Sequence, residues 1–198
     1  MRKRFFFVLW TLLLTVCACS SGAEDVGGHS YEKIPDACTL VDPAATRWML
    51  GAGASPERPS AGAVPRGDGQ SLCDWSLSTS GGMTVSLVER MHARSNGGIT
   101  AAKKSLNFDR SFTCEGHRDR CRELSGVGNE AFLVGDDLIT PKVKPAGYIQ
   151  FRVREENVVV VIVYMRGGRR ESEVSSASMI QNGTQLAKDV VKRIRASK

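Results

Sequence analysis

The sequence predicts an α+β fold, in which helices pack on an antiparallel β-sheet and disulfides staple the domain. Two segments of alternating polar and apolar residues flank Ser80-Gly81-Gly82, a pattern typical of a β-hairpin. A second pair of strand-like segments, 148–154 and 157–165, is separated only by an acidic turn. An amphipathic helix is predicted at 174–196. Hairpins with adjoining helices indicate an antiparallel sheet covered by helices.

The N-terminal segment has the pattern of a lipoprotein signal peptide. Three cations at positions 2–4 precede the apolar run 5–16, which is shorter than the ~20 apolar residues that cross a bilayer and fits a signal h-region. Residues 16–19, VCAC, resemble the bacterial lipobox, whose cysteine is diacylated and becomes the new N-terminus. We therefore expect removal of residues 1–18 and lipidation of Cys19. The protein would then be anchored by lipid, palmitate included, at the extracytoplasmic face of the cell membrane.

The mature chain is predicted to be a short tether followed by one domain. Residues 19–33 are small, polar and acidic, with little to bury. A flexible chain of about 14 residues would hold the domain roughly 20 Å from the membrane surface. Residues 34–198 fit a single α+β globular domain with a substantial core.

The charge of the mature chain gives no indication of a nucleic-acid partner. Loss of the three cations at positions 2–4 lowers the formal charge from +6 to +3, which is too mild for nucleic-acid binding. We expect contact with the membrane through the anchor, together with an unknown envelope protein or small ligand.

The first half of the domain is predicted to contain a helix, a loop, a hairpin and a second helix. Asp42-Pro43 is a helix-start signal, and Gly51 ends that helix. Residues 51–70, rich in Gly, Pro and Ala, are interpreted as a long exposed loop. Strands are expected at 71–78 and 83–91 and a helix at 98–108. The expected buried side chains are Ala44, Ala45, Trp48 and Met49 or Leu50 in the first helix, Leu72, Trp75 or Leu77, Val85 and Leu87 in the hairpin, and Ile99, Ala102 and Leu106 in the second helix.

The second half adds strands and a long helix. A strand at 130–134 and a polar loop at 135–145 precede the strand 148–154 and a turn at 155–157. The strand 157–165, NVVVVIVYM, is apolar on both faces, which predicts a strand covered on both sides or the centre of the sheet. In the last helix Gly183 is expected to cost about 1 kcal/mol relative to alanine. The helix has a predicted buried stripe of Met179, Leu186, Val190 and Ile194. Both halves combine paired strands with an adjoining helix, which suggests an internal repeat.

Four cysteines remain for disulfides once Cys17 leaves with the signal and Cys19 carries lipid. Cys38, Cys73, Cys114 and Cys121 are an even number in an oxidising compartment, and they allow three pairings. We favour Cys38 with Cys73 and Cys114 with Cys121, because the second pair brackets the short polar loop EGHRDR.

Several of these segments together resemble a family of actinobacterial lipoproteins of unknown function. The segments are DACTLVDP at 36–43, CDW at 73–75, GVGNEA at 126–131 and RVREENVVVV at 152–161, and the likeness spans about residues 35–194. The resemblance implies a lipid-anchored envelope protein with a Cys38–Cys73 bridge. More distantly, the chain looks like the extracellular sensor domains of bacterial Ser/Thr kinases and the PsbP-like fold. Neither resemblance implies a catalytic residue.

The candidate chemical motifs favour structural interpretations. Residues 126–131 fit the G-x-G-x-x-A dinucleotide pattern, but a polar segment precedes them and a strand follows, so a turn is predicted. His117 lies between Cys114 and Cys121 without a second ligand pair nearby, which favours a disulfide over zinc. The acid pairs Asp136-Asp137 and Glu155-Glu156 fall in predicted turns, where solvated carboxylates are expected. The other histidines are His29, in the tether, and His92, at a strand end. No catalytic residue, metal or cofactor is predicted.

Cations concentrate near the C-terminus and allow two interpretations. The patch would be attracted to anionic headgroups or envelope polymers. Alternatively, it is a solvated face with cations placed favourably at a helix C-terminus, which we prefer. The cations are Arg166, Arg169, Arg170, Lys188, Lys192, Arg193, Arg195 and Lys198.

The first functional hypothesis is a lipid-anchored, non-enzymatic envelope module that binds a ligand or protein partner. Its contact surface would be loop 51–70 or loop 135–145, because long loops on a stapled scaffold are common binding sites. The alternative is an envelope hydrolase acting on cell-wall or lipid material, which would need a cleft with perturbed ionisable groups. A third hypothesis, a structural accessory subunit, would show a broad apolar patch. Trp48 and Trp75 are expected in the core rather than at a ligand.

Overall fold

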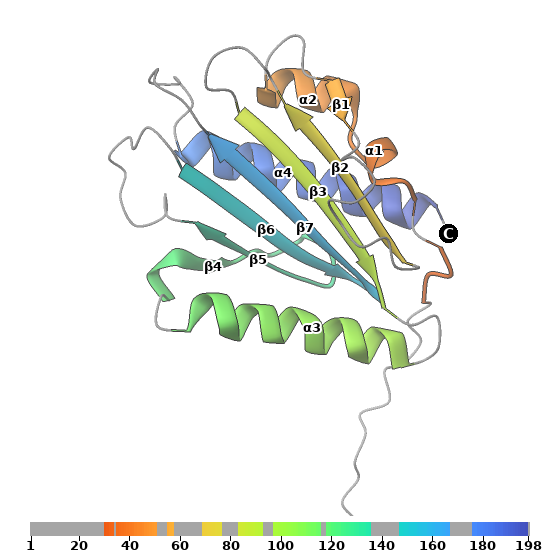
Figure 1. Ribbon diagram of the computed structural model, residues 1–198. Helices are drawn as coiled ribbons and strands as arrows, with labels where there is room; N and C mark the ends of the chain where they lie inside the picture. The colour runs from red at the N-terminus through yellow and green to blue at the C-terminus, as the bar shows by residue number, and fades with distance from the viewer. Residues whose placement is uncertain are drawn as a thin grey trace, which may run out of the picture.

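The molecule is built on one antiparallel β-sheet (Figure 1). The computed structural model describes residues 30–33, 35–50, 55–57, 69–76, 83–92, 97–115, 118–135, 147–166 and 176–197. The seven strands lie in the order β1-β2-β3-β7-β6-β5-β4. They are β1 (Ser55–Glu57), β2 (Gln70–Ser76), β3 (Met83–Met91), β4 (Cys121–Glu123), β5 (Glu130–Gly135), β6 (Gly147–Glu155) and β7 (Val158–Arg166).

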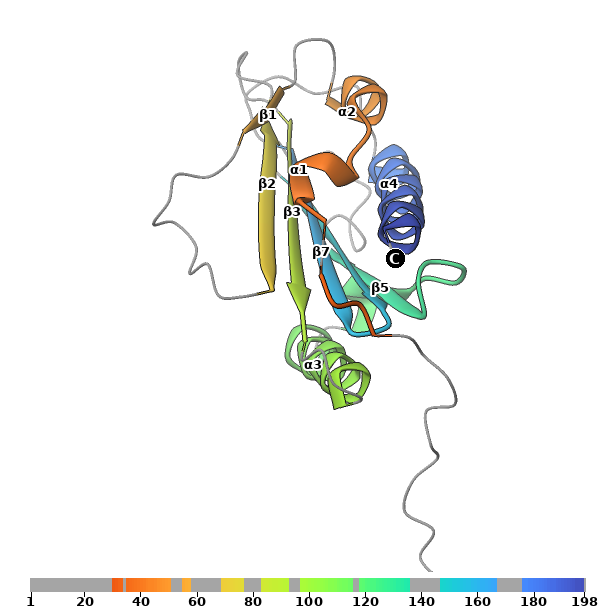
Figure 2. The ribbon, with the colours of Figure 1, turned by 90° about the vertical axis from the view of Figure 1, so that its right-hand side faces the viewer.

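Helices cover the two faces of the sheet unequally. The helices α1 (Ala37–Leu40), α2 (Pro43–Leu50) and α4 (Ser176–Ala196) lie on one side (Figure 2). The helix α3 (Gly97–Cys114) packs on the other face against β5, β6 and β7. A short 3₁₀ helix, η1 (Arg118–Arg120), follows it. These helices on an antiparallel sheet confirm the α+β prediction.

Alternation along the strands divides the core into two clusters. In β7, Val158, Val160, Ile162 and Tyr164 belong to the large cluster beneath α4. Val159, between them in sequence, belongs to a small cluster with Leu106 of α3. Successive strand side chains point to opposite faces, so β7 is buried on both. The prediction that 157–165 forms the sheet centre is confirmed, because β7 is the middle strand.

Most long elements form where the sequence predicts them. The helix α2 begins after Asp42, whose Oδ1 accepts a hydrogen bond from the Ala44 N–H at 2.7 Å, as an N-cap does. The β2–β3 hairpin pairs Trp75 with Val85. The helix α3 extends to Cys114, six residues past the predicted end. The predicted buried stripes are confirmed in both long helices: Ile99, Ala102 and Leu106 in α3, and Met179, Leu186, Val190 and Ile194 in α4.

Some details of the prediction are wrong. Ser55–Glu57, inside the predicted loop 51–70, forms β1 because its backbone pairs with the edge of β2. In β2, Cys73 and Trp75 are buried in the large cluster, whereas Leu72 is only half-buried and lies on the other face by alternation. Ala44 is exposed and its neighbour Ala45 is buried.

Three other short elements were not predicted. They are α1, β4 and η1, each of three or four residues. Leu77, Ile34 and Gly51 lie outside the described residues, as do the side chains of Trp48, Met49, Leu50, Val85 and Leu87.

Both favoured disulfides are present. Cys38 and Cys73 join α1 to β2 with a Cα–Cα distance of 5.1 Å. Cys114 and Cys121 join the last residue of α3 to the first of β4, with Cα atoms 5.8 Å apart. Each disulfide therefore ties a helix to the sheet, one on each face.

Gly183 in α4 is explained by close packing. A Cβ atom built at this position would lie 2.2 Å from Cε2 of Phe151 and 2.3 Å from its Cζ. Phe151 is a fully buried residue of β6, so its ring would have to shift within the core. Glycine thus lets α4 approach the sheet closely, which offsets its poor helix propensity.

Candidate functional site

A buried asparagine attaches the N-terminal segment to the sheet. Asn157, in the turn between β6 and β7, is fully buried. Its Oδ1 accepts a hydrogen bond from the Tyr31 N–H at 2.7 Å, and its Nδ2 donates to the carbonyl oxygens of Tyr31 and His92 at 3.0 and 3.1 Å. The His92 N–H donates to the Asn157 carbonyl at 2.8 Å. We call the end of the sheet at Tyr31, His92 and Asn157 the anchor end.

Tyr31 belongs to the fixed part of the molecule although the sequence analysis places it in the tether. It is 4% exposed and packs in the large core cluster. Burial, followed by the nearby negative charges of Glu155 and Glu156, raises the pKa of Tyr31 to about 12. The phenol is therefore protonated at neutral pH, and the segment leading to the N-terminus is held by its first described residues.

The expectation that both carboxylates of the 155–156 turn are solvated is wrong for Glu155. Glu155 is 2% exposed and accepts two hydrogen bonds from Arg195 of α4, at 2.7 and 2.8 Å. This hydrogen bonding to Glu155 raises the pKa of Arg195. A buried carboxylate needs such a charged partner, and the pair joins the end of α4 to the anchor end. Glu156 is half-buried, with a positive φ of 52° at the turn.

Two strand connections, β2–β3 and β5–β6, lie at the opposite end of the sheet. We call it the loop end. Six strand residues that flank segments 51–54, 77–82, 136–146 and 167–175 lie there, as the strand register shows: Ser55, Ser76, Met83, Gly135, Gly147 and Arg166. Met165, paired with Tyr148 and Thr84, is 42% exposed at this end. The ends are about 26 Å apart, since β7 rises roughly 3.3 Å per residue.

The outer surface of α3 carries two exposed aromatic rings. Phe108 is 68% exposed and Phe112 is 81% exposed. The rings stack with centroids 6.3 Å apart and planes at 13°. Their exposure is high for phenylalanine, whose burial is usually favourable. The sequence analysis missed this pair, although the signal was present as two aromatics four residues apart on the polar side of an amphipathic helix.

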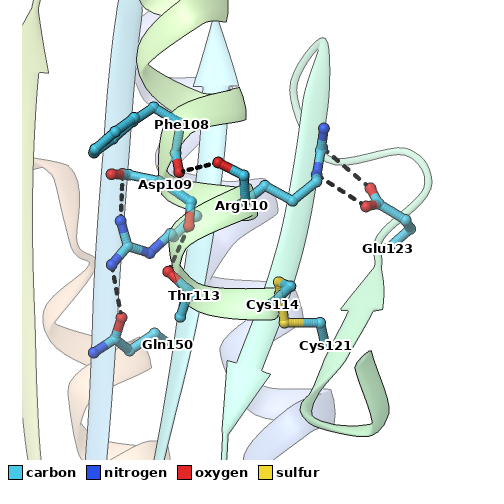
Figure 3. Close-up of a disulfide and its surroundings, with 10 residues drawn as sticks. Phe108, Asp109, Arg110, Thr113, Cys114, Cys121, Glu123 and Gln150 are labelled. Atoms are coloured by element: carbon cyan, nitrogen blue, oxygen red, sulfur yellow. Dashed lines mark hydrogen bonds and ion pairs between the residues drawn. A yellow bond between two sulfur atoms is a disulfide. The ribbon is translucent and has the colours of Figure 1, made fainter. Parts of the chain in front are cut away.

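Ion pairs fix the C-terminal half of α3 on the sheet. Asp109 forms an ion pair with Arg152 of β6. Arg110 lies 3.1 Å from Glu123 of β4 and has its guanidinium 5.1 Å from the ring centroid of Phe132. Figure 3 shows Arg110 pointing toward Glu123, with Phe108 on the other side of the helix. The helix is thus held by its polar flanks and the Cys114–Cys121 bridge, while Phe108 and Phe112 are left outside.

The cations of α4 are partly neutralised by ion pairs. Arg193 pairs with Asp42 at 2.7 Å, and Arg195 pairs with Glu155. Lys188 and Lys192 are exposed. Arg169, Arg170 and Lys198 lie outside the described residues, as does the side chain of Arg166. These pairings are consistent with the preferred interpretation of a solvated helix face.

The glycine motif at 126–131 is a turn, as predicted. Gly126 and Gly128 have positive φ values of 72° and 60°, and the segment leads into β5 rather than a helix. A Cβ on Gly128 would lie 2.5 Å from the Arg154 carbonyl oxygen. That oxygen accepts a hydrogen bond from the Asn129 N–H at 2.8 Å, so the glycine permits a backbone contact and has no phosphate-binding geometry.

Other sequence candidates lie outside the described residues: Cys19, His29, His117, Asp136-Asp137, residues 136–145 of one candidate loop, and residues 51–54 and 58–68 of the other. In the part of the chain that is described, no three His, Cys, Asp or Glu side chains gather as a metal site would need. Among the same residues no helix has the length and apolar character to cross a bilayer.

Comparisons with known proteins add no relative. No protein family, no curated protein and no solved structure matches the chain. The resemblance to actinobacterial lipoproteins and to PsbP-like folds therefore stays a prediction.

Proposed function

We propose that the chain is a lipid-anchored module of the extracytoplasmic membrane face that binds a protein partner through the loop end and has no catalytic activity of its own. The observation that carries this proposal is the separation of the two ends of the sheet. Tyr31 is fixed at the anchor end by Asn157, whereas the strand residues that flank four chain segments, and the exposed Met165, lie about 26 Å away. Lipid attachment at Cys19 would therefore present the loop end away from the bilayer.

The composition of the loop end supports a binding role. Segment 136–146, DDLITPKVKPA, mixes acids, lysines, prolines and aliphatic residues, and its two flanking glycines are in strands β5 and β6. Loops displayed on a rigid sheet are the usual location of binding residues. Two disulfides and a nine-residue β3–β7 pairing provide the rigid support.

The ionisable groups support a non-enzymatic role. Among the described residues, Tyr31 and Arg195 are the groups whose pKa is raised, and both lie beside the buried Glu155. A catalytic site also perturbs pKa values, but the cluster of Tyr31, Glu155 and Arg195 has a structural role. Glu155 joins β6 to α4, and Tyr31 begins the path to the tether.

The partner-binding proposal is tested by site-specific photo-crosslinking in intact cells. A photoreactive amino acid replaces Met165 at the loop end, and in a matched variant it replaces Lys188, exposed on α4. We expect a reproducible protein adduct from position 165 that is absent from position 188. Identical adducts at both positions, or only bulk membrane proteins at 165, would contradict binding at the loop end.

The anchor is tested separately by mass spectrometry of the N-terminal peptide. We expect a diacylated Cys19 as the first residue and loss of membrane association in Cys19→Ala after removal of the signal segment. An intact N-terminus in the cellular protein would refute the anchor.

A further inference from the structure

The exposed face of α3 has the features of a helix that lies on a lipid surface. Thr100, Lys104, Phe108 and Phe112 follow one another at intervals of four residues, so they form one exposed stripe along the helix. Lys103 is exposed beside it. Aromatic rings flanked by lysines are typical of helices that lie at the boundary between headgroups and acyl chains.

The helix starts at the anchor end. His92, bonded to Asn157, is five residues before Gly97, the first residue of α3. Figure 1 shows α3 running from this end of β3 beneath the strands toward β4. Tyr31 is bonded to the same asparagine. Tyr31 and His92, the last described residue before α3, are therefore joined through one side chain.

The reach of the tether matches the position of the rings. Tyr31 is twelve positions after Cys19, which gives a mean span of about 19 Å and a maximum of about 40 Å for a flexible chain. Phe108 and Phe112 lie roughly 16 and 22 Å from the start of α3, at about 1.5 Å per residue. A lipid attached at Cys19 would thus keep the stripe within reach of the bilayer.

The charge of the N-terminal half of the stripe suits an anionic surface. Lys103 and Lys104 are exposed, and the one acid between them and Phe112, Asp109, is paired with Arg152. The carboxylate is therefore neutralised where the helix would approach headgroups. Lysines near such a surface are attracted to its negative potential.

A lipid surface fits the stripe better than a second copy of the chain. Two phenylalanines present at most roughly 400 Å², whereas a stable dimer buries about 800 Å² on each partner. An acyl-chain boundary accepts a small apolar area without needing a complementary protein surface.

We propose that α3 rests on the membrane, with Phe108 and Phe112 inserted at the headgroup boundary and Lys103 and Lys104 facing anionic phospholipids. This orientation rests on the proposed anchor at Cys19.

Lysine footprinting of the lipidated protein tests the orientation. The full mature protein is reconstituted at low density in vesicles of anionic phospholipid and treated with a water-soluble amine-acylating reagent. Each lysine is compared with itself after the vesicles are dissolved in a non-ionic detergent. Burial of the two rings favours the state in which α3 contacts the membrane by roughly a hundredfold. We therefore expect Lys103 and Lys104 to react at least about tenfold more slowly in vesicles. Lys188 and Lys192 on α4 should change little.

Two variants separate ring insertion from other causes of protection. In Phe108→Ser/Phe112→Ser, the lysines of α3 should react in vesicles as fast as those of α4. In the matched variant Asn107→Ser/Ser111→Ala, which changes exposed polar positions with the same spacing, protection should persist. Unprotected Lys103 and Lys104 in the wild type would overturn the orientation, and so would protection that increases with protein density, which assigns the stripe to a second copy.

The N-terminal peptide of the same digest distinguishes the two proposals. Acylated Cys19 with unprotected Lys103 and Lys104 overturns only the α3 contact. A chain without lipid on Cys19 overturns the anchor and the orientation together.

Discussion

Replacing Asn157 by alanine tests whether the anchor end depends on one side chain. The substitution removes three hydrogen bonds, two to the backbone of Tyr31 and one to the backbone of His92. It leaves the Tyr31 N–H and two carbonyl groups without this partner in a buried place. Each buried polar group that loses its partner costs about 1–3 kcal/mol. Since a carbonyl has a second lone pair, we expect a total loss of roughly 3–5 kcal/mol in the free energy of unfolding.

Asn129→Ala is the matched control. Asn129 supports the same turn by accepting a hydrogen bond from the Glu156 N–H at 2.6 Å, but its side chain is exposed. Water replaces the lost partner there, so the expected cost is about 0.5–1.5 kcal/mol. Asn157→Asp keeps an acceptor for the Tyr31 N–H and loses the two donated bonds, so its cost should exceed that of the control.

Urea unfolding at neutral pH without reductant measures these differences. Circular dichroism and tryptophan fluorescence are followed together, and coincident curves justify a two-state treatment. Amide exchange at Tyr31 should also accelerate in Asn157→Ala, because the N-terminal segment would open locally. Equal losses in Asn157→Ala and Asn129→Ala would refute the argument that the buried network holds this segment.

Three further predictions concern pH, packing and the short disulfide. Because folding raises the pKa of Tyr31 from 10.0 to about 12, its contribution to stability is complete below pH 10 and is lost as pH rises through about 12. Tyr31→Phe should therefore lose about 2–3 kcal/mol less than the wild type over that range, measured by urea unfolding at each pH; parallel pH profiles would contradict this. Gly183→Ala should destabilise by about 1–3 kcal/mol because its methyl group would overlap the buried ring of Phe151, and Phe151→Leu in the same chain should recover part of the loss; a more stable Gly183→Ala protein would disprove the packing argument. Removing the short bridge with Cys114→Ser/Cys121→Ser should lower the free energy of unfolding by about 2.5 kcal/mol, and removing the Cys38–Cys73 bridge should lower it by about 4 kcal/mol, because the second loop is longer. Thermal unfolding measures both, and a larger loss for the short bridge would contradict this order.

The sequence predicts well those elements whose signal is local and repeated. The β2–β3 hairpin follows from alternation and a glycine turn, and the buried stripe of α4 follows from helical spacing. Apolar residues on both faces of 157–165 were enough to predict its central place. The short elements α1, β1 and β4 contain too few residues for periodicity. Two of them form because they pair with a neighbouring strand: β1 pairs with β2, and β4 pairs with β5.

The candidate site was harder to predict because its contacts join distant residues. Asn157 and Tyr31 are 126 positions apart, and Glu155 meets Arg195 from 40 positions away. A turn that contains adjacent acids looks solvated from the sequence alone. The carboxylate of Glu155 is buried because the C-terminal end of α4 lies against the end of β6. The exposure of Phe108 likewise depends on which side of α3 faces the sheet.

The pairing of β3 with β7 has a consequence for biogenesis. Met83 meets Arg166 and Met91 meets Val158, so the first hairpin is synthesised well before the strand that completes its open edge. Until then, that edge offers unpaired amides to any neighbouring chain. A ribosome or export channel that releases the polypeptide from its N-terminus thus creates a period of vulnerability to aggregation, which ends when the last strand arrives.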